Sequence, residues 1–357
     1  MKIGVPKEIK AFENRVGLSP SSVSELVLYN HNVFVQTDAG LGSGFSNKDY
    51  LEAGANIVNS IEDVYNNSEL IVKVKEPQEA EYNLLKQNHT LFTYLHLASS
   101  QSLTNALLNC GATCIAYETV QKSDGSLPLL LPMSEIAGRL SVIEGSKYLQ
   151  KTYGGKGKLI SSVPGVASTK VLVLGGGIVG TNAARMASGL GASVTIIDNN
   201  INRLRILEEI LPANVKTIYS NRNNILKEIC WADLIIGAVL IPGAQAPRLI
   251  RRADLQNMEP GTVLVDVAID QGGCFETSKA TTHMDPIYEV DGIIHYCVAN
   301  MPGSVPRTAT EALNNATLPY VLEIANKGIN EALKNPEILK GLNIQNGKVV
   351  LKALIVQ

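Results

Sequence analysis

The stretch that most constrains the fold is residues 171–198, which read VLVLGGGIVGTNAARMASGLGASVTIID. An apolar run meets a glycine turn, a helical pattern follows, and a second apolar run ends in Asp198. Strand, glycine turn, helix, strand and acid in this order are typical of a dinucleotide-binding unit. We expect Gly175 to make the tight turn, Gly177 to let the backbone approach a pyrophosphate, and Gly180 to let helix and strand pack closely.

The same unit indicates which dinucleotide binds. A helix that starts in the glycine turn offers free N–H groups and a partial positive charge to phosphates. Asp198 follows Gly180 by 18 residues, about where an acid meets the ribose hydroxyls of NAD. A glycine motif alone is common in proteins, but with its flanking strands and acid it predicts an NAD site.

Length and charge narrow the class of protein. A chain of 357 residues exceeds one ordinary core, so we expect two domains. The net charge of −2 gives no electrostatic case for binding nucleic acid or an anionic membrane. No apolar run reaches the ~18 residues of a membrane span, and the N-terminal MKIGVPKEIK lacks the apolar core of a signal peptide. Only 18% of the residues are charged, which favours a surface partly covered by other subunits and hence a homo-oligomer.

The cysteines indicate the compartment. Their number is odd, they are scattered along the chain, and none belongs to a CxxC pair. They are Cys110, Cys114, Cys230, Cys274 and Cys297. Thiols in this pattern are typical of a reduced, cytoplasmic protein, and we expect no metal site.

Apolar strands and helical patterns alternate along both halves of the chain, which predicts α/β architecture with parallel sheets. In the first half, strands are expected at residues 2–5, 33–36, 70–74, 91–95 and 113–116, with helices at 21–28 and 102–108. In the second half, strands are expected at residues 171–174, 193–197, 215–218, 234–236, 263–265 and 294–297. A long helix over residues 133–153, with Ser134 as its cap or in its first turn, precedes the second half, and a helix over 309–332, kinked at Pro319, follows it.

The expected fold class is therefore α/β, with two Rossmann-like, doubly wound parallel-sheet domains and a cleft between them. The last helix cannot form a domain alone, so we expect the chain after residue 305 to return to the first domain. Residues 1–128 and 306–357 would then form a discontinuous substrate domain, and residues 129–305 the NAD-binding domain.

Three titratable residues stand at strand ends, where ligands bind in open α/β sheets. Lys75 ends the run LIVKVK, His96 ends LFTYLH, and Asp270 closes VLVDVAID. An isolated histidine in such a run is usually structural, but three groups at three strand ends predict a site in the cleft between the domains. Arg15, in the loop after the first strand, joins them; the alternative for Arg15 is a solvated loop arginine.

At these residues the chain resembles the L-alanine dehydrogenase family, which is related to the nucleotide-binding subunit of proton-translocating nicotinamide nucleotide transhydrogenase. The resemblance covers nearly the whole chain. Its motifs are GVPKE at 4–8, ENR at 13–15, GSGF at 42–45, VKEP at 74–77, YLHLA at 94–98, PMSEIAG at 132–138, IGAVLIPG at 236–243, DVAIDQGG at 266–273 and HYCVANMPG at 295–303.

The resemblance implies a role for each site residue. It implies that Arg15 and Lys75 bind the substrate carboxylate and carbonyl, that His96 is the catalytic acid/base, and that Asp270 assists proton and water handling. It further implies a cofactor site that includes the glycine turn. This site comprises Ser134, Gly175, Gly177, Ile178, Val179, Gly180, Asp198, Arg203, Ser220, Val239, Leu240, Val267, Ala268, Ile269, Asp270, Lys279, Val298, Ala299, Asn300 and Met301.

Three segments depart from the family pattern. Ser161 and Ser162 replace glycines, residues 277–280 read TSKA where Arg-Pro is common, and Gln245 stands where lysine is frequent. None of the four proposed catalytic and substrate-binding residues is changed.

The implied reaction is the reversible conversion of L-alanine, NAD⁺ and water into pyruvate, ammonium and NADH, by hydride transfer from the α-carbon to the nicotinamide. The resemblance also implies a homohexamer. Two other functions stay open at this point: a transhydrogenase-type subunit that passes hydride between nucleotides, and an NAD-binding regulatory protein without catalysis.

Overall fold

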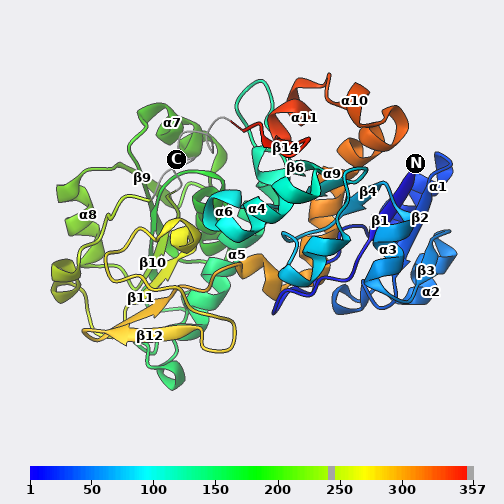
Figure 1. The fold of residues 1–357 in the computed structure, drawn as a ribbon. Helices are drawn as coiled ribbons and strands as arrows, with labels where there is room; N and C mark the ends of the chain where they lie inside the picture. The colour runs from blue at the N-terminus through cyan, green and yellow to red at the C-terminus, as the bar shows by residue number, and fades with distance from the viewer. Residues whose placement is uncertain (240–245, 352–357) are drawn as a thin grey trace. The chain divides into compact units, whose positions relative to one another are not determined.

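The computed structural model describes residues 1–239 and 246–351, and the chain separates into two compact units. Unit 1 combines residues 1–133 with the chain from residue 303 onward, and unit 2 comprises residues 134–302. Each unit is an α/β unit built on a predominantly parallel sheet (Figure 1), so the predicted α/β class with two parallel-sheet domains is confirmed. The domain boundaries were expected after residues 128 and 305. In the structure, the chain changes unit after residues 133 and 302.

The sheet of unit 1 has the order β15-β14-β6-β5-β4-β1-β2-β3. Its strands are β1 (Lys2–Val5), β2 (Asn32–Gln36), β3 (Asn56–Val58), β4 (Leu70–Val72), β5 (Thr90–Thr93), β6 (Thr113–Ala116), β14 (Leu342–Gln345) and β15 (Lys348–Val349). Strands β1 to β6 run parallel, whereas β14 is antiparallel to both β6 and β15. The expected strands over 70–74 and 91–95 are shorter than predicted, because the chain leaves the sheet after Val72 and after Thr93.

The helices of unit 1 are α1 (Pro20–Leu28), α2 (Asn47–Glu52), α3 (Ile61–Asn67), α4 (Gln101–Cys110), α9 (Pro306–Lys327), α10 (Ile329–Ala332) and α11 (Pro336–Gly341). The single helix expected over 309–332 is therefore two helices. The break falls at Gly328, whose φ of +76° favours glycine, while Pro319 lies inside α9.

A buried cluster covers one face of this sheet. Ile71 and Leu91 from the strands pack with Tyr65 of α3, Leu107 of α4 and Ile344 of β14, all at most 1% exposed. The end of the chain thus contributes to the same core as its beginning, which explains why residues after 303 belong to unit 1.

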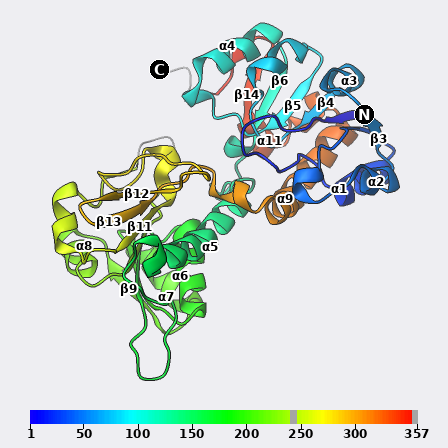
Figure 2. The same ribbon diagram turned by 90° about the horizontal axis from the view of Figure 1, so that it is seen from below.

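The sheet of unit 2 has the order β12-β13-β11-β10-β7-β8-β9. Its strands are β7 (Lys170–Leu174), β8 (Ser193–Asp198), β9 (Val215–Tyr219), β10 (Leu234–Gly237), β11 (Val263–Asp266), β12 (Ile287–Val290) and β13 (Ile293–Tyr296). All neighbours are parallel except β12 and β13. Its helices are α5 (Leu131–Tyr148), which begins in unit 1, α6 (Ile178–Gly189), α7 (Ile201–Ile210) and α8 (Arg222–Ile229). Figure 2 shows these elements from below.

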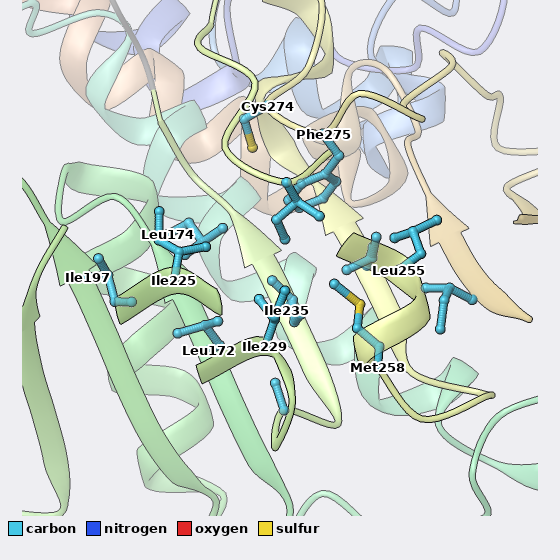
Figure 3. Packing of buried hydrophobic residues seen from close by; sticks show 14 of the residues in the cluster. Leu172, Leu174, Ile197, Ile225, Ile229, Ile235, Leu255, Met258, Cys274 and Phe275 are labelled. Atoms are coloured by element: carbon cyan, nitrogen blue, oxygen red, sulfur yellow. The ribbon is translucent and has the colours of Figure 1, made fainter. Parts of the chain in front are cut away.

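Helices cover both faces of this second sheet. On one face, Leu172 and Ile235 pack against Ile225 and Ile229 of α8 (Figure 3). On the other face lies α6, whose Gly180 approaches Val173 so closely that a Cβ there would be 3.2 Å from the valine side chain. The helix expected over 133–153 ends at Tyr148, and a separate 3-10 turn follows at Lys151–Tyr153.

Within the described ranges 1–239 and 246–351, no helix is both long enough and apolar enough to cross a membrane.

Candidate functional site

In unit 1, three of the predicted site residues share one edge of the sheet. Arg15 follows β1, Lys75 follows β4 and His96 follows β5. These three strands are parallel neighbours, so their carboxyl ends lie at the same edge. The chain also reverses its direction of winding at β1, whose neighbours are β2 and β4, and such a switch point is where open α/β sheets bind ligands.

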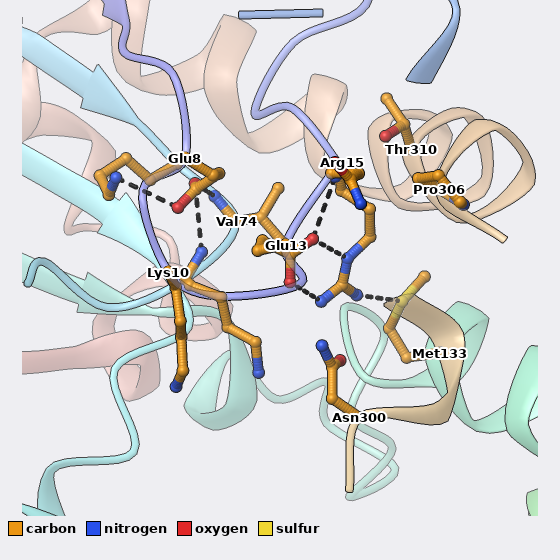
Figure 4. Close-up of polar contacts among 12 residues, drawn as sticks. Glu8, Lys10, Glu13, Arg15, Val74, Met133, Asn300, Pro306 and Thr310 are labelled. Carbon is orange, nitrogen blue, oxygen red and sulfur yellow. Dashed lines mark hydrogen bonds and ion pairs between the residues drawn. The ribbon is translucent and has the colours of Figure 1, made fainter. Parts of the chain in front are cut away.

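Arg15 is not the solvated loop arginine of the alternative interpretation, because it is only 2% exposed. Its Nε donates to Glu13 Oε1 at 2.7 Å, its Nη2 donates to Glu13 Oε2 at 2.5 Å, and its Nη1 lies 3.1 Å from Met133 Sδ (Figure 4). Burial alone would lower the pKa of Arg15, but the hydrogen bonds and charge of Glu13 outweigh it and raise that pKa. The guanidinium is therefore a fixed, buried cation.

The long helix α9 holds the loop that carries Arg15. The backbone N–H of Val16 donates to Thr310 Oγ1 at 3.2 Å, and the N–H of Ser19 donates to Asn314 Oδ1 at 2.6 Å. Asn314 in turn donates to the carbonyl of Gly17 at 3.2 Å. Both side chains of α9 are at most 1% exposed, so buried hydrogen bonds fix the loop directly after Arg15.

Lys75 lies in a partly buried position with cations around it. Burial is the main cause that lowers its pKa, and the charges of Arg15 and Lys10 lower it further. Its backbone carbonyl accepts a hydrogen bond from Thr93 Oγ1 at 2.9 Å. A lysine with a lowered pKa near an arginine is typical of an anion-binding or carbonyl-binding site.

His96 adopts a left-handed backbone conformation, with φ 49° and ψ 41°, and its side chain is exposed. Its ring stacks on Tyr94 with a centroid distance of 5.9 Å. Glu118 stabilises the unusual backbone: its carboxylate accepts the N–H of His96 at 2.6 Å and that of Leu95 at 3.2 Å. Glu118 follows β6 and comes directly after the apolar run Cys114–Tyr117, but sequence reasoning missed it.

Sequence reasoning also missed the buried residue Lys73. Of the two lysines in the run 70–75, sequence reasoning selected Lys75, but Lys73 is the one that is fully buried. It pairs with Glu8 and Glu81 at 3.2 and 2.9 Å. The sequence contained a signal for Lys73, because a lysine flanked by Val72 and Val74 in an apolar run needs buried counter-charges.

In unit 2, the glycine turn joins β7 to α6. Gly175 has a φ of +102°, and a Cβ there would lie 2.7 Å from the carbonyl oxygen of Ala238. A Cβ on Gly180 would lie 1.8 Å from the carbonyl oxygen of Gly175. A Cβ on Gly177, in contrast, would meet nothing within 4 Å, so the backbone at the start of α6 borders open space. An unobstructed helix start of this kind fits a phosphate group.

Asp198 ends β8 and contacts this turn. One oxygen of Asp198 accepts the N–H of Gly176 at 2.7 Å, and the other accepts the N–H of Asn200 at 2.8 Å. Arg203 reaches back from α7 to the same turn, donating to the Gly176 carbonyl at 2.6 Å and to Thr181 Oγ1 at 2.8 Å. The acid and the arginine therefore both bind the backbone of the glycine turn.

Most other predicted cofactor residues follow strands of the same parallel sheet and so lie at one edge. Ser220 follows β9, Val239 follows β10, Val267–Asp270 form most of a 3-10 turn after β11, and Val298–Met301 follow β13. Ile178 and Val179 begin α6, and Ser134 lies in the first turn of α5. Lys279 is exposed, with its Nζ 5.6 Å from the centroid of the Tyr288 ring. Leu240 and Gln245 lie outside the described residues.

Asp270 is exposed in the 3-10 turn Val267–Gln271, and the buried Asp266 organises that turn. Asp266 accepts the N–H groups of Ala268 at 3.0 Å, Cys274 at 2.9 Å and Phe275 at 3.4 Å, as well as the hydroxyl of Ser278. Burial raises the pKa of Asp266. Sequence reasoning passed over this acid in favour of the exposed one. Among residues 1–239 and 246–351, no group of acidic, histidine or cysteine side chains could hold a metal ion.

Comparisons with known proteins agree along the whole chain. The family models described as alanine dehydrogenase/PNT match residues 4–137 with their N-terminal domain and residues 141–352 with their C-terminal domain. An alanine dehydrogenase of Halomonas elongata is 55% identical over 355 residues, which cover 99% of this chain and 96% of that protein. An alanine dehydrogenase of Methanococcus maripaludis is 54% identical over 99% of this chain and 95% of its own length. A solved L-alanine dehydrogenase structure, 54% identical, matches with a TM-score of 0.97 over 99% of this chain and 98% of its own.

Proposed function

The chain belongs to the alanine dehydrogenase/PNT family, and from this premise we propose that unit 1 binds the amino-acid or keto-acid substrate while unit 2 binds NAD. It is an NAD-dependent oxidoreductase that acts on L-alanine. The observation that carries the division of roles is the common edge of Arg15, Lys75 and His96 in the sheet of unit 1.

NAD supplies the hydride acceptor when it is bound. The open space at Gly177 and the acid at the end of β8 fit the group, because the first accommodates a pyrophosphate and the second accepts hydrogen bonds from ribose hydroxyls. We assign the cofactor to the residues after β7, β8, β9, β10, β11 and β13 described above.

Arg15 and Lys75 bind the substrate in this proposal. Glu13 accepts hydrogen bonds from Nε and Nη2 of the Arg15 guanidinium, and Met133 Sδ lies 3.1 Å from Nη1, so these contacts hold the buried cation in place for the substrate carboxylate. A planar guanidinium suits a carboxylate because it can donate paired hydrogen bonds to it. Lys75 places a cation by the carbon that becomes the carbonyl of pyruvate, where it stabilises the developing negative charge on oxygen.

His96 moves the protons. Once the α-carbon of alanine has lost its hydride, formation of pyruvate and ammonium requires that water add to the iminium carbon and lose a proton, and that the amine leave with a proton. An exposed histidine at the end of β5 can exchange protons with both water and substrate. Asp270, exposed at the end of the turn after β11, orients the attacking water and stabilises the iminium cation.

We further propose a homohexamer in the cytoplasm that degrades L-alanine. The low proportion of charged residues, 18%, supports an assembly, and the five free cysteines support a reducing compartment.

The test is a panel assay of NADH formation with L-alanine, glycine, L-serine and L-2-aminobutyrate, together with the reverse reaction of pyruvate, ammonium and NADH. We expect the highest kcat/KM for L-alanine and turnover in both directions. Hydride transfer only to a second nucleotide would identify a transhydrogenase-type protein, and NAD binding without turnover would identify a regulatory one.

A further inference from the structure

Unit 1 contains a buried charge cluster that the reaction does not use directly. It consists of Glu8, Lys73 and Glu81, which are 8%, 0% and 0% exposed. The Nζ of Lys73 lies 3.2 Å from Glu8 Oε2 and 2.9 Å from Glu81 Oε1. Buried ion pairs are often no more stabilising than apolar residues of the same size, so stability alone does not explain this cluster.

The two carboxylates of the cluster differ in what else they bind. Glu81 accepts hydrogen bonds from the Tyr65 hydroxyl at 3.0 Å and from the backbone N–H of Gln78 at 2.8 Å. Glu8 instead binds the segment that carries Lys75: its Oε1 accepts the N–H of Val74 at 2.6 Å and that of Lys75 at 3.3 Å. Of the two buried acids, Glu8 therefore contacts the backbone of a substrate-binding residue, whereas Glu81 binds Tyr65 and Gln78.

The backbone carbonyls of residues 74 and 75 also accept hydrogen bonds, and we call the contacts that hold the N–H groups and carbonyls of this segment the clamp. The carbonyl of Val74 accepts the N–H of Tyr94 at 3.2 Å, and the carbonyl of Lys75 accepts Thr93 Oγ1 at 2.9 Å. Glu8 thus holds the N–H side of the segment while β5 and the residue after it hold the carbonyl side. In the described part of the chain, these two N–H groups find their acceptor in the Glu8 side chain, whereas the N–H of Lys73 still donates to the Phe92 carbonyl of β5.

Lys73 completes the arrangement by fixing the Glu8 carboxylate. Its ammonium binds Oε2 of Glu8, which leaves Oε1 for the two backbone N–H groups. Hydrogen bonds to an ionised carboxylate are roughly twice as strong as neutral ones, so the charge of Glu8 strengthens the clamp.

We propose that Glu8 is a positioning residue for substrate binding: its carboxylate, paired with Lys73, fixes the backbone of residues 74–75 and thereby the origin and direction of the Lys75 side chain. This inference rests on the proposed role of Lys75. Glu8 contacts no substrate atom in this arrangement and acts only through Lys75.

The experiment compares Glu8→Gln with the matched control Glu81→Gln. Both substitutions remove one negative charge beside Lys73, so both are expected to lower the melting temperature. Only Glu8→Gln weakens the clamp, and we expect it to raise the KM for pyruvate about 10-fold, the size of one charge-assisted hydrogen bond, while the KM for NADH stays the same. Glu8→Asp retains the charge but shortens the side chain, and it should raise the pyruvate KM in a protein that still folds.

A double-mutant cycle with Lys75→Ala separates positioning from a general loss of structure. If Glu8 acts through Lys75, Glu8→Gln adds no further change in pyruvate KM on the Lys75→Ala background. Equal pyruvate KM changes in Glu8→Gln and Glu81→Gln, an unchanged KM in both Glu8 variants, or a full effect on the Lys75→Ala background would overturn the inference. An unchanged pyruvate KM in Lys75→Ala alone would instead remove the proposed role of Lys75.

Discussion

At the scale of single residues, the site combines a strained backbone at His96 with buried charges that have defined partners. His96 has a positive φ, a conformation that side chains other than glycine rarely adopt. The Glu118 carboxylate compensates by accepting two successive backbone N–H groups. Strain of this kind persists where the surrounding structure fixes it, and it is concentrated at functional sites.

The role of His96 gives the first prediction. His96→Ala should lower kcat about 10²-fold, because acid–base catalysis by one positioned side chain typically contributes at least that much. NADH affinity, measured by fluorescence titration, should be retained because His96 belongs to unit 1. His31→Ala is the control, since the ring nitrogens of His31 bind Asn326 and the N-terminus, away from the proposed site residues, and its loss should leave turnover near the wild-type value. Wild-type kcat in His96→Ala would refute the assignment.

Lys75 gives a prediction on pH. Its pKa lies below the usual lysine value of about 10.4, mainly through burial and further through Arg15 and Lys10. A lysine is cationic below its pKa, so its attraction for pyruvate is present at lower pH and is lost as the pH rises through the lowered pKa. We expect the affinity of the NADH complex for pyruvate, measured without ammonium, to fall at a less alkaline pH than an ordinary lysine would give.

The control for this titration is Lys75→Arg, which stays charged throughout the range. It should move the alkaline loss of pyruvate affinity to higher pH, even if the affinity at neutral pH is lower. The same alkaline loss in both proteins would show that another group is responsible.

At the scale of elements, two glycines of the turn in unit 2 should have different effects when substituted: one on stability and the other on NADH binding. Ala at position 180 would place its Cβ 1.8 Å from the Gly175 carbonyl oxygen, whereas Ala at position 177 would meet open space. We therefore expect Gly180→Ala to lower the melting temperature clearly and Gly177→Ala to leave it near the wild-type value. Gly177→Ala should nevertheless weaken NADH binding, because its methyl group occupies the space that a pyrophosphate needs. Normal NADH affinity in a folded Gly177→Ala protein would contradict this placement of the pyrophosphate.

The elements also show what the sequence could and could not predict. Strands such as β7 and β10 are continuous apolar runs buried on both faces, a pattern that sequence reasoning recognises. Strands β3, β12, β14 and β15 were missed; β15 has only two residues, and β14 is a short strand that pairs with β6, far away along the chain. The contacts of α9 with the Arg15 loop were missed for the same reason, since Asn314 and Gly17 meet only through tertiary structure.

The candidate site likewise contains residues that the sequence could predict and residues that it could not. The position of Lys75, His96 and Asp270 beyond strand ends follows from local pattern and the rule for parallel sheets. Glu8 and Glu118, which bind the backbone at Lys75 and His96, follow other strands, β1 and β6, and only tertiary structure pairs them with those residues. A lysine inside an apolar run was a visible clue, and it indicated Lys73 as well as Lys75.

At the scale of the whole molecule, the proposed function assigns substrate and cofactor to different units, so each specificity should change independently. Unit 1 is built from both ends of the chain and unit 2 from its middle. A substitution at the nucleotide end of unit 2 should therefore alter the choice between NAD and NADP while the KM for L-alanine stays the same.

Asp198 is the residue for that test. Both of its oxygens already accept backbone N–H groups, which fixes the carboxylate at the end of β8. A 2′-phosphate beside it would cost several kcal/mol through like-charge repulsion, so the wild-type protein should prefer NAD strongly. Arg203 does not offset this cost readily, because it would have to give up its hydrogen bonds to Gly176 and Thr181, and Arg205 already donates to Asn202. Asp198→Ala should lower kcat/KM with NAD and raise it with NADP, while Asn199→Ala, at the exposed neighbouring position, should change neither. Comparable kcat/KM values for the two nucleotides in the wild-type protein would show that Asp198 does not face the ribose.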